Sequence, residues 1–104
     1  MKILPEPVSF IWDKGNIDKN LKKHKITNKE AEEAFENSPK FIFDDEKHSI
    51  NEKRYMIWGK TDKDKLLSIF FTMRNDQVRI ISARPMHKKE RRAYEKKSQT
   101  NTQI

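Results

Sequence analysis

The sequence predicts an α+β fold in which two amino-terminal helices precede an antiparallel sheet of three or four strands and a further helix closes the chain. Apolar residues recur at helical spacing before Pro39 and after Pro85, and β-branched or aromatic runs lie between these prolines. The gaps between the runs are too short for crossover helices. Since 104 residues allow one core, we expect a single domain over residues 1–97 and a flexible polar tail over residues 98–104.

The first helix is expected over residues 14–24, after a β-prone or extended apolar run. Asp13 stands at its start, where a carboxylate can accept hydrogen bonds from free backbone N–H groups. Ile17, Leu21 and His24 recur at spacings of four and three residues, so we expect them to share one face of this helix.

The second helix has a more specific start signal. Thr27-Asn28-Lys29-Glu30 has the form of a capping box, in which the threonine and glutamate side chains each satisfy a free backbone donor. The helix places Ala31, Ala34 and Phe35 on its inner face. It should end just before Pro39, because proline disfavours helical geometry in the preceding residue.

Four segments between the two prolines are predicted as strands, at residues 41–43, 53–58, 66–72 and 77–84. Their short polar connections favour hairpins and therefore a meander. Simple alternation along the last segment gives two faces, each of which mixes apolar and basic residues. One face holds Val78, Ile80, Ser82 and Arg84, and the other holds Arg79, Ile81 and Ala83.

The closing helix is expected over residues 86–97, where Met86, Glu90, Ala93 and Tyr94 recur at helical spacing. Six Lys or Arg residues against two Glu give this segment a net charge of +4. Such a surface can bind RNA, although exposed helix faces are often equally charged for solubility. Its candidate RNA-binding residues are Lys88, Lys89, Arg91 and Arg92.

The composition narrows the function classes. A net charge of +7 and a pI near 9.7 attract polyanions or acidic proteins at low salt, which makes nucleic acid the leading partner class. The absence of cysteine excludes disulfides, thiol catalysis and thiolate metal sites, as fits a reducing cytoplasm. No apolar stretch approaches membrane-spanning length, and the first residues, Met1 to Pro5, do not resemble a secretion signal.

The polar residues suit metal-free cleavage of RNA. That reaction needs a base for the 2′-hydroxyl, an acid for the leaving oxygen and cations for the charge that develops on phosphorus. Candidates for moving or steering protons are His24, His48, Glu52 and Lys22. Candidates for holding phosphate, on or beside predicted strands, are Arg54, Arg79 and Arg84.

Each candidate also has a structural interpretation. His24 can interact favourably with a helix end, and His48 lies in an acidic run that is either a solvated loop or, less in keeping with known ligand spacings, a metal site. Glu52 and Arg54 can form an exposed ion pair on one strand face. The strand arginines need an anion, which is either a protein carboxylate or a phosphate. Among the aromatic residues, Trp58 is expected in the core, whereas Trp12, Tyr55 and Tyr94 are expected either in the core or stacked on bases.

Several longer series bring these residues into one ordered pattern. They are Phe10 to Asp13, Asn20 to His24, Glu30-Ala31 with Phe35, Asp45 to Ser49, Glu52 to Tyr55, Gly59, Leu66-Leu67, Thr72 to Arg74, Val78 to Arg84, Glu90 to Arg92 and Tyr94-Glu95. Together they resemble the BrnT toxin family over roughly residues 10–95. The resemblance implies a RelE-like fold and a metal-independent endoribonuclease that needs no cofactor and arrests growth by cutting cellular RNA.

The resemblance also implies a partner and a set of site positions. The partner is a BrnA-like antitoxin with a ribbon-helix-helix DNA-binding domain, and operator DNA is contacted only through it. The family's polar positions fall on Lys22, His24, His48, Glu52, Arg54, Arg79 and Arg84. A non-catalytic RNA- or ribosome-binding module, or an inactive toxin kept as an operon co-repressor, remains the alternative function.

Two departures from the family pattern stand out. Lys25 follows His24 where the family usually has glycine, so a left-handed helix end there would be strained by roughly 1 kcal/mol. Pro85-Met86-His87 replaces the usual small or basic residues before the closing helix. The first departure bears on how His24 is oriented.

Overall fold

The computed structural model describes residues 4–102, and it confirms the α+β class with an antiparallel sheet and a closing helix. The helices are α1 (Lys19–His24), α2 (Asn28–Glu36), the short 3-10 helix η1 (Glu46–His48) and α3 (Lys88–Thr102). The strands are β1 (Phe41–Asp44), β2 (Arg54–Lys60), β3 (Leu66–Arg74) and β4 (Gln77–Pro85). Residues 1–3, where no secretion signal is expected, and residues 103–104 of the expected polar tail lie outside the described residues.

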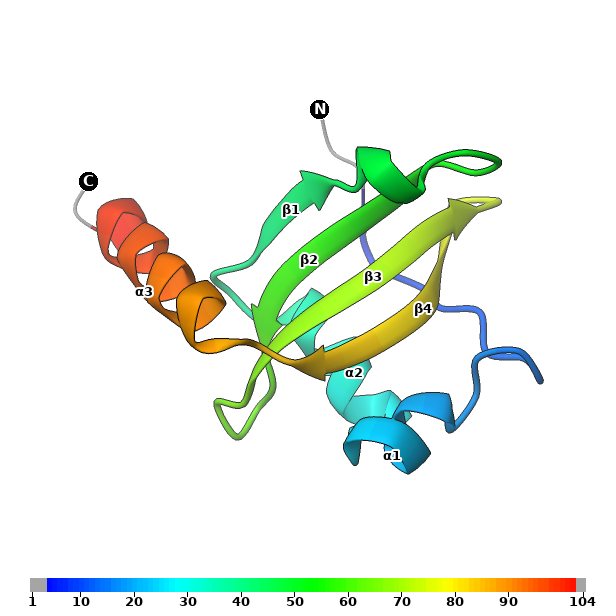
Figure 1. The fold of residues 1–104 in the computed structure, drawn as a ribbon, viewed down its shortest axis with the longest axis horizontal. Helices are drawn as coiled ribbons and strands as arrows, with labels where there is room; N and C mark the ends of the chain where they lie inside the picture. The colour runs from blue at the N-terminus through cyan, green and yellow to red at the C-terminus, as the bar shows by residue number, and fades with distance from the viewer. Residues whose placement is uncertain (1–3, 103–104) are drawn as a thin grey trace.

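The four strands form one antiparallel meander in the order β1-β2-β3-β4, as the short connections predicted. In Figure 1, α1 and α2 lie together on one side of the sheet, and α3 extends away beyond the end of β4. The tight turn between β3 and β4 places Asn75 and Asp76 at φ 51° and 63°, the left-handed geometry that two-residue hairpin loops require.

The core lies between α2 and one face of the sheet. Its buried residues are Ile26, Ala31, Ala34, Phe35, Ile57, Leu67, Ile69, Phe71, Val78, Ile80 and Ala83. The predicted capping box opens α2, with hydrogen bonds of 3.0 Å from Glu30 N to Thr27 Oγ1 and from Thr27 N to Glu30 Oε1. At Gly59 the strand approaches α2 so closely that a side-chain methyl would collide with the carbonyl oxygen of Ala34. The inner face predicted for α2 is therefore confirmed.

The first helix differs from its prediction. It begins at Lys19 instead of residue 14, because Asp18 adopts a left-handed conformation (φ 58°) that interrupts the turns before it. Ile17 and Leu21, expected with His24 on the packed face, are 47% and 44% exposed, whereas Asn20 is buried. The Asn20 side chain accepts a 2.9 Å hydrogen bond from Ala83 N, so α1 packs through an amide on the edge of β4.

The outer edge of β4 is covered along its length. Val78 exchanges backbone hydrogen bonds of 2.8 Å with Ser9 and Ile11, and the buried Asn16 side chain donates to Ile80 O at 3.0 Å. Pairing of this kind removes the free donors and acceptors that an edge strand would otherwise present. The extended amino-terminal run thus becomes a partner of β4, through an isolated bridge between Phe10 and Val78.

A β-bulge in β4 changes the predicted faces. Phe71 is in register with Ile80, but Phe70 is in register with Ser82, so Ile81 is an extra residue in the strand. Simple alternation was therefore wrong beyond this point. Val78, Ile80 and Ala83 face the core, whereas Arg79, Ile81, Ser82 and Arg84 belong to the opposite face.

The closing helix continues to Thr102, so residues 98–102, assigned above to a polar tail, are helical. Trp58, expected in the core, is instead half-buried on the other face of the sheet, in edge-to-face contact with Phe43 at 4.7 Å. Tyr55 and Tyr94 are packed within the protein: Tyr55 stacks on Phe71, and the hydroxyl of buried Tyr94 donates to Pro39 O at 2.6 Å. Within the described part of the chain, no helix is long and apolar enough to cross a membrane.

Candidate active site

The sheet face opposite the core brings together three of the predicted phosphate-binding residues. Arg54 on β2 and Arg79 on β4 flank Thr72 of β3 in one cross-strand row. Arg84 lies beside Ser68, four residues further along β3, which corresponds to about 13 Å. We call this surface, defined by Arg54, Arg79 and Arg84, the arginine face. Arg79 and Arg84 share it only because of the bulge, since five residues of regular strand would place them on opposite sides.

A pocket of about 240 Å³ opens on the arginine face and contains two of the predicted catalytic residues. We call it the His48 pocket; its lining residues are Asp45, His48, Arg54, Phe70, Ile81 and Ser82. The loop from β1 to β2 is closed over it by hydrogen bonds from Asp45 N to Arg54 O (3.0 Å) and from Arg54 N to Ser49 Oγ (2.9 Å). These two hydrogen bonds with the backbone of Arg54 hold η1, and hence His48, next to the start of β2.

Within the pocket, Asp45 orients His48. The imidazole Nδ1 lies 3.0 and 3.1 Å from the two Asp45 carboxylate oxygens. A carboxylate at this nitrogen favours the form in which Nδ1 carries the hydrogen, which leaves Nε2 available to accept a proton. The Asp45 side chain is only 13% exposed and the His48 side chain is 55% exposed, so the ring is held from the protein side and open on the other.

Among the three residues of the arginine face, Arg54 is the one that is not paired with a protein carboxylate. It is half-buried, and within residues 4–102 its guanidinium makes no hydrogen bond or ion pair. Phe70 lines the same pocket, and its ring lies 5.7 Å from the Arg84 guanidinium carbon. A half-buried cation without a protein anion, beside an oriented imidazole, is suited to hold a phosphate.

The other two arginines already bind carboxylates. Arg79 Nη2 donates to Asp13 Oδ1 at 3.0 Å, and the hydrogen bond from Gly15 N, followed by that from Arg79, lowers the pKa of Asp13. Arg84 binds Glu90 through two hydrogen bonds of 2.6 and 3.0 Å. Burial raises the pKa of Glu90, but the hydrogen bonds from Arg84 and from His87 N outweigh it and lower that pKa to about 2.

Glu52 lies outside the His48 pocket. It precedes β2 and forms a two-point ion pair with Arg74, at 2.8 and 3.0 Å, instead of the predicted pair with Arg54. The hydrogen bond from Arg74 lowers the pKa of Glu52. Because β2 and β3 are antiparallel, the start of β2 lies beside the end of β3. Glu52 therefore has a nearer basic neighbour on the adjacent strand than along its own strand.

His24 is also separate from His48. It lines another pocket, of about 500 Å³, with Lys25 and Arg91, near the start of β3 and the end of β4. Lys25 has φ 58°, the left-handed helix end anticipated from the sequence. The remaining predicted RNA-binding residues, Lys22 on α1 and Lys88, Lys89 and Arg92 on α3, are exposed.

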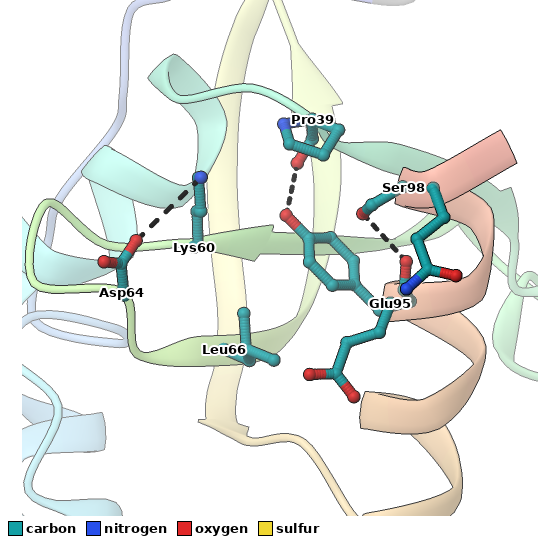
Figure 2. A pocket seen from close by; sticks show the side chains of 8 residues that line it. Pro39, Lys60, Asp64, Leu66, Glu95 and Ser98 are labelled. Atoms are coloured by element: carbon teal, nitrogen blue, oxygen red, sulfur yellow. Dashed lines mark hydrogen bonds and ion pairs between the residues drawn. The ribbon is translucent and has the colours of Figure 1, made fainter. Parts of the chain in front are cut away.

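A third pocket, of about 570 Å³, contains none of the predicted site residues. Figure 2 shows Pro39, Lys60, Asp64 and Leu66 facing Glu95 and Ser98 of α3 across it. The hydrogen bond from Tyr94 to Pro39 joins α3 to the other side of the pocket, where Lys60 and Asp64 form an ion pair of 3.9 Å. No three His, Asp or Glu side chains within residues 4–102 form a group that could hold a metal ion.

Four residues of the His48 pocket were not among the predicted site residues: Asp45, Phe70, Ile81 and Ser82. Asp45 could have been found, since it stands three residues before His48, a spacing that brings side chains together in a helical turn. Ile81 and Ser82 could not, because the bulge decides which residues of β4 face the pocket. Phe70 on β3 could not, because an apolar residue of a strand gives no sign of which face of the sheet is buried.

Comparison with known proteins adds a family match. The model of the family described as ribonuclease toxin, BrnT, of type II toxin-antitoxin system matches residues 12–90. This span contains α1, α2, the whole sheet and all six residues of the His48 pocket. A search of curated proteins gave no match.

Proposed function

This chain belongs to the BrnT family of type II toxin-antitoxin ribonuclease toxins, and from that premise we propose that it cleaves RNA in the His48 pocket. The observation that carries the proposal is the combination of an imidazole oriented by Asp45 and an unpaired arginine lining one pocket. The proposed activity is that of a metal-independent endoribonuclease, with charge stabilisation supplied by arginine.

In the proposed mechanism, His48 Nε2 takes the proton of a ribose 2′-hydroxyl, and the 2′-oxygen attacks the adjacent phosphorus. The bond from phosphorus to the 5′-oxygen breaks, the leaving oxygen takes a proton from water, and a 2′,3′-cyclic phosphate remains. Arg54 holds the non-bridging oxygens, on which negative charge grows in the transition state. Arg79 and Arg84 stay paired with their carboxylates, which largely neutralise their charge, so Arg54 is left as the cation that holds the reacting phosphate.

The fold and family support further parts of the proposal. Helices before a four-stranded antiparallel sheet and one after it suit a RelE-like assignment. Type II membership implies an antitoxin partner, and we assign this role to a BrnA-like protein with a ribbon-helix-helix domain that also carries the complex to operator DNA. Expression without antitoxin should then arrest growth by cutting cellular RNA in the cytoplasm.

The test is cleavage of a single-stranded RNA by purified protein in EDTA, comparing wild type with His48→Gln and Arg54→Ala. Loss of a positioned base should slow cleavage by about 10²- to 10⁴-fold. His87→Gln is the matched control, because His87 is exposed outside the pocket. Equal activity of all variants would reject this site, and RNA binding without cleavage by wild type would favour a non-catalytic module or an inactive co-repressor.

A further inference from the structure

The pocket that contains His24 and Arg91 is distinct from the His48 pocket and is strongly basic; we call it the Arg91 pocket. It opens near Leu66, whereas Arg54 lies beside Thr72, six residues along β3 or about 20 Å away. Four basic residues line it, together with one acidic residue: His24, Lys25, Lys65, Arg91 and Asp64. Its walls also include the buried apolar residues Ile26, Leu67 and Met86.

The charges in the Arg91 pocket are only partly neutralised. Lys65 forms an ion pair of 2.9 Å with Glu30, and Asp64 lies 3.9 Å from Lys60. By contrast, the side chains of His24, Lys25 and Arg91 make no hydrogen bond or ion pair with any other residue in the range 4–102. Two permanent positive charges and an imidazole, from two different helix ends, therefore border one pocket without being paired to a protein carboxylate.

Lys25 is held there in an unfavourable backbone conformation. Its φ of 58° and ψ of 33° lie in the left-handed region, where glycine is free of the steric cost that a side chain brings. Hydrogen bonds from Lys25 N to Leu21 O and from Ile26 N to Asn20 O fix this geometry. The lysine side chain is therefore not needed for the turn, and its charge can be removed without harm to the fold.

We propose that the Arg91 pocket is a second phosphate subsite, which holds a backbone phosphate of single-stranded RNA several nucleotides from the bond cleaved in the His48 pocket. This extends the proposed function, because it names how the substrate is gripped away from the reacting phosphate. His24 is in this account a positioning residue for RNA and not a proton-transfer group.

The experiment measures binding of a fluorescent 2′-O-methyl oligoribonucleotide, which cannot be cleaved, to wild type, Lys25→Gly and Arg91→Ala. Each variant should lose about fivefold in affinity at about 50 mM salt, and the slope of log affinity against log salt should fall by about 0.7. Lys25→Gly should at the same time raise the midpoint of thermal unfolding, so reduced binding cannot be attributed to a damaged fold. Lys23→Ala and Lys96→Ala remove the same charge from the same helices without lining the pocket, and should change affinity less than twofold.

Unchanged binding by Lys25→Gly and Arg91→Ala, or equal losses in the two controls, would overturn the subsite. So would a loss of affinity for a poly-glutamate peptide without any loss for the oligonucleotide, since that result would assign the pocket to an acidic protein segment. Because the probe cannot be cut, these outcomes do not depend on whether the His48 pocket is catalytic.

Discussion

Asp45 sets the orientation of the His48 imidazole and thereby which ring nitrogen faces a substrate. An exposed imidazole on a loop has many orientations, and a hydrogen bond at Nδ1 selects the one that leaves Nε2 outward. Asp45 is well placed for this because its own backbone is paired with Arg54 and its carboxylate is largely buried. The neighbouring Asp44 differs in its side chain, which is 53% exposed and, among the described residues, forms an ion pair with Lys53 alone, at 3.5 Å.

We predict that Asp45→Asn slows RNA cleavage about 100-fold, because an amide no longer fixes the imidazole tautomer. Single-turnover cleavage at saturating protein measures this effect apart from RNA binding, which should stay within about twofold. Asp44→Asn is the control and should retain nearly full activity. Equal losses in both variants would mean that the acidic run acts only through its total charge.

At the level of elements, the bulge in β4 assembles the arginine face. If the five steps from Arg79 to Arg84 followed a regular strand, the two arginines would lie on opposite faces of the sheet. The same shift sends Ala83 into the core, where Asn20 of α1 binds its backbone N–H. The bulge thus couples the packing of the first helix to the position of the cations.

Deletion of Ile81 alone should therefore leave the fold intact, because it turns the bulge into regular strand: Ile80 and Ala83 still face the core, and Arg79 and Arg84 still share the arginine face. Deletion of Ile81 and Ser82 together should prevent folding, because it would turn Arg84 toward the core and Ala83 toward the opposite face. The burial of an unpaired guanidinium costs several kcal/mol, a large part of the stability of a small domain. Far-ultraviolet circular dichroism during thermal unfolding should show a cooperative transition for the single deletion and none for the double deletion; the same behaviour in both variants would contradict this role for the bulge.

At the scale of the whole molecule, the pair formed by Arg84 and Glu90 joins the sheet to α3. Both side chains are largely buried, at 22% and 17% exposure, and Glu90 also accepts a hydrogen bond from His87 N at the start of the helix. Since the pKa of Glu90 is about 2 in the folded protein and 4.5 is its usual value, the ionised carboxylate favours folding. This contribution is complete above about pH 4.5 and is lost as the pH falls through 2.

We predict that Glu90→Gln lowers the free energy of unfolding by about 1–2 kcal/mol at pH 7, a value reduced for the solvent exposure of the pair. The difference from wild type should shrink as the pH falls from 4.5 toward 2, because wild type then loses the same charge. Urea denaturation at several pH values measures both effects. Glu95→Gln, on an exposed part of the same helix, should show neither, and a pH-independent difference would reject the linkage.

Features that depend on near neighbours in the chain could be predicted from the amino-acid sequence alone. The capping box at Thr27, the stop before Pro39 and the four strands with short connections rest on local backbone chemistry and on alternation, and the structure confirms them. The resemblance to BrnT toxins rested on the order of whole series of residues, and the family match confirms it. The roles of individual site residues remain predictions.

The grouping of the candidate residues depends on contacts between segments that are far apart in the chain. The bulge places Arg79 and Arg84 on one face, and an extra residue in a strand leaves no mark in the alternation of its side chains. The hairpin ends pair Glu52 with Arg74, and His24 and His48 lie in different pockets, because contacts between distant segments depend on strand register. The first helix packs through Asn20 instead of Ile17 and Leu21 for a related reason. The edge of β4 has backbone groups that need hydrogen-bond partners, and the spacing of residues within the helix does not reveal those groups.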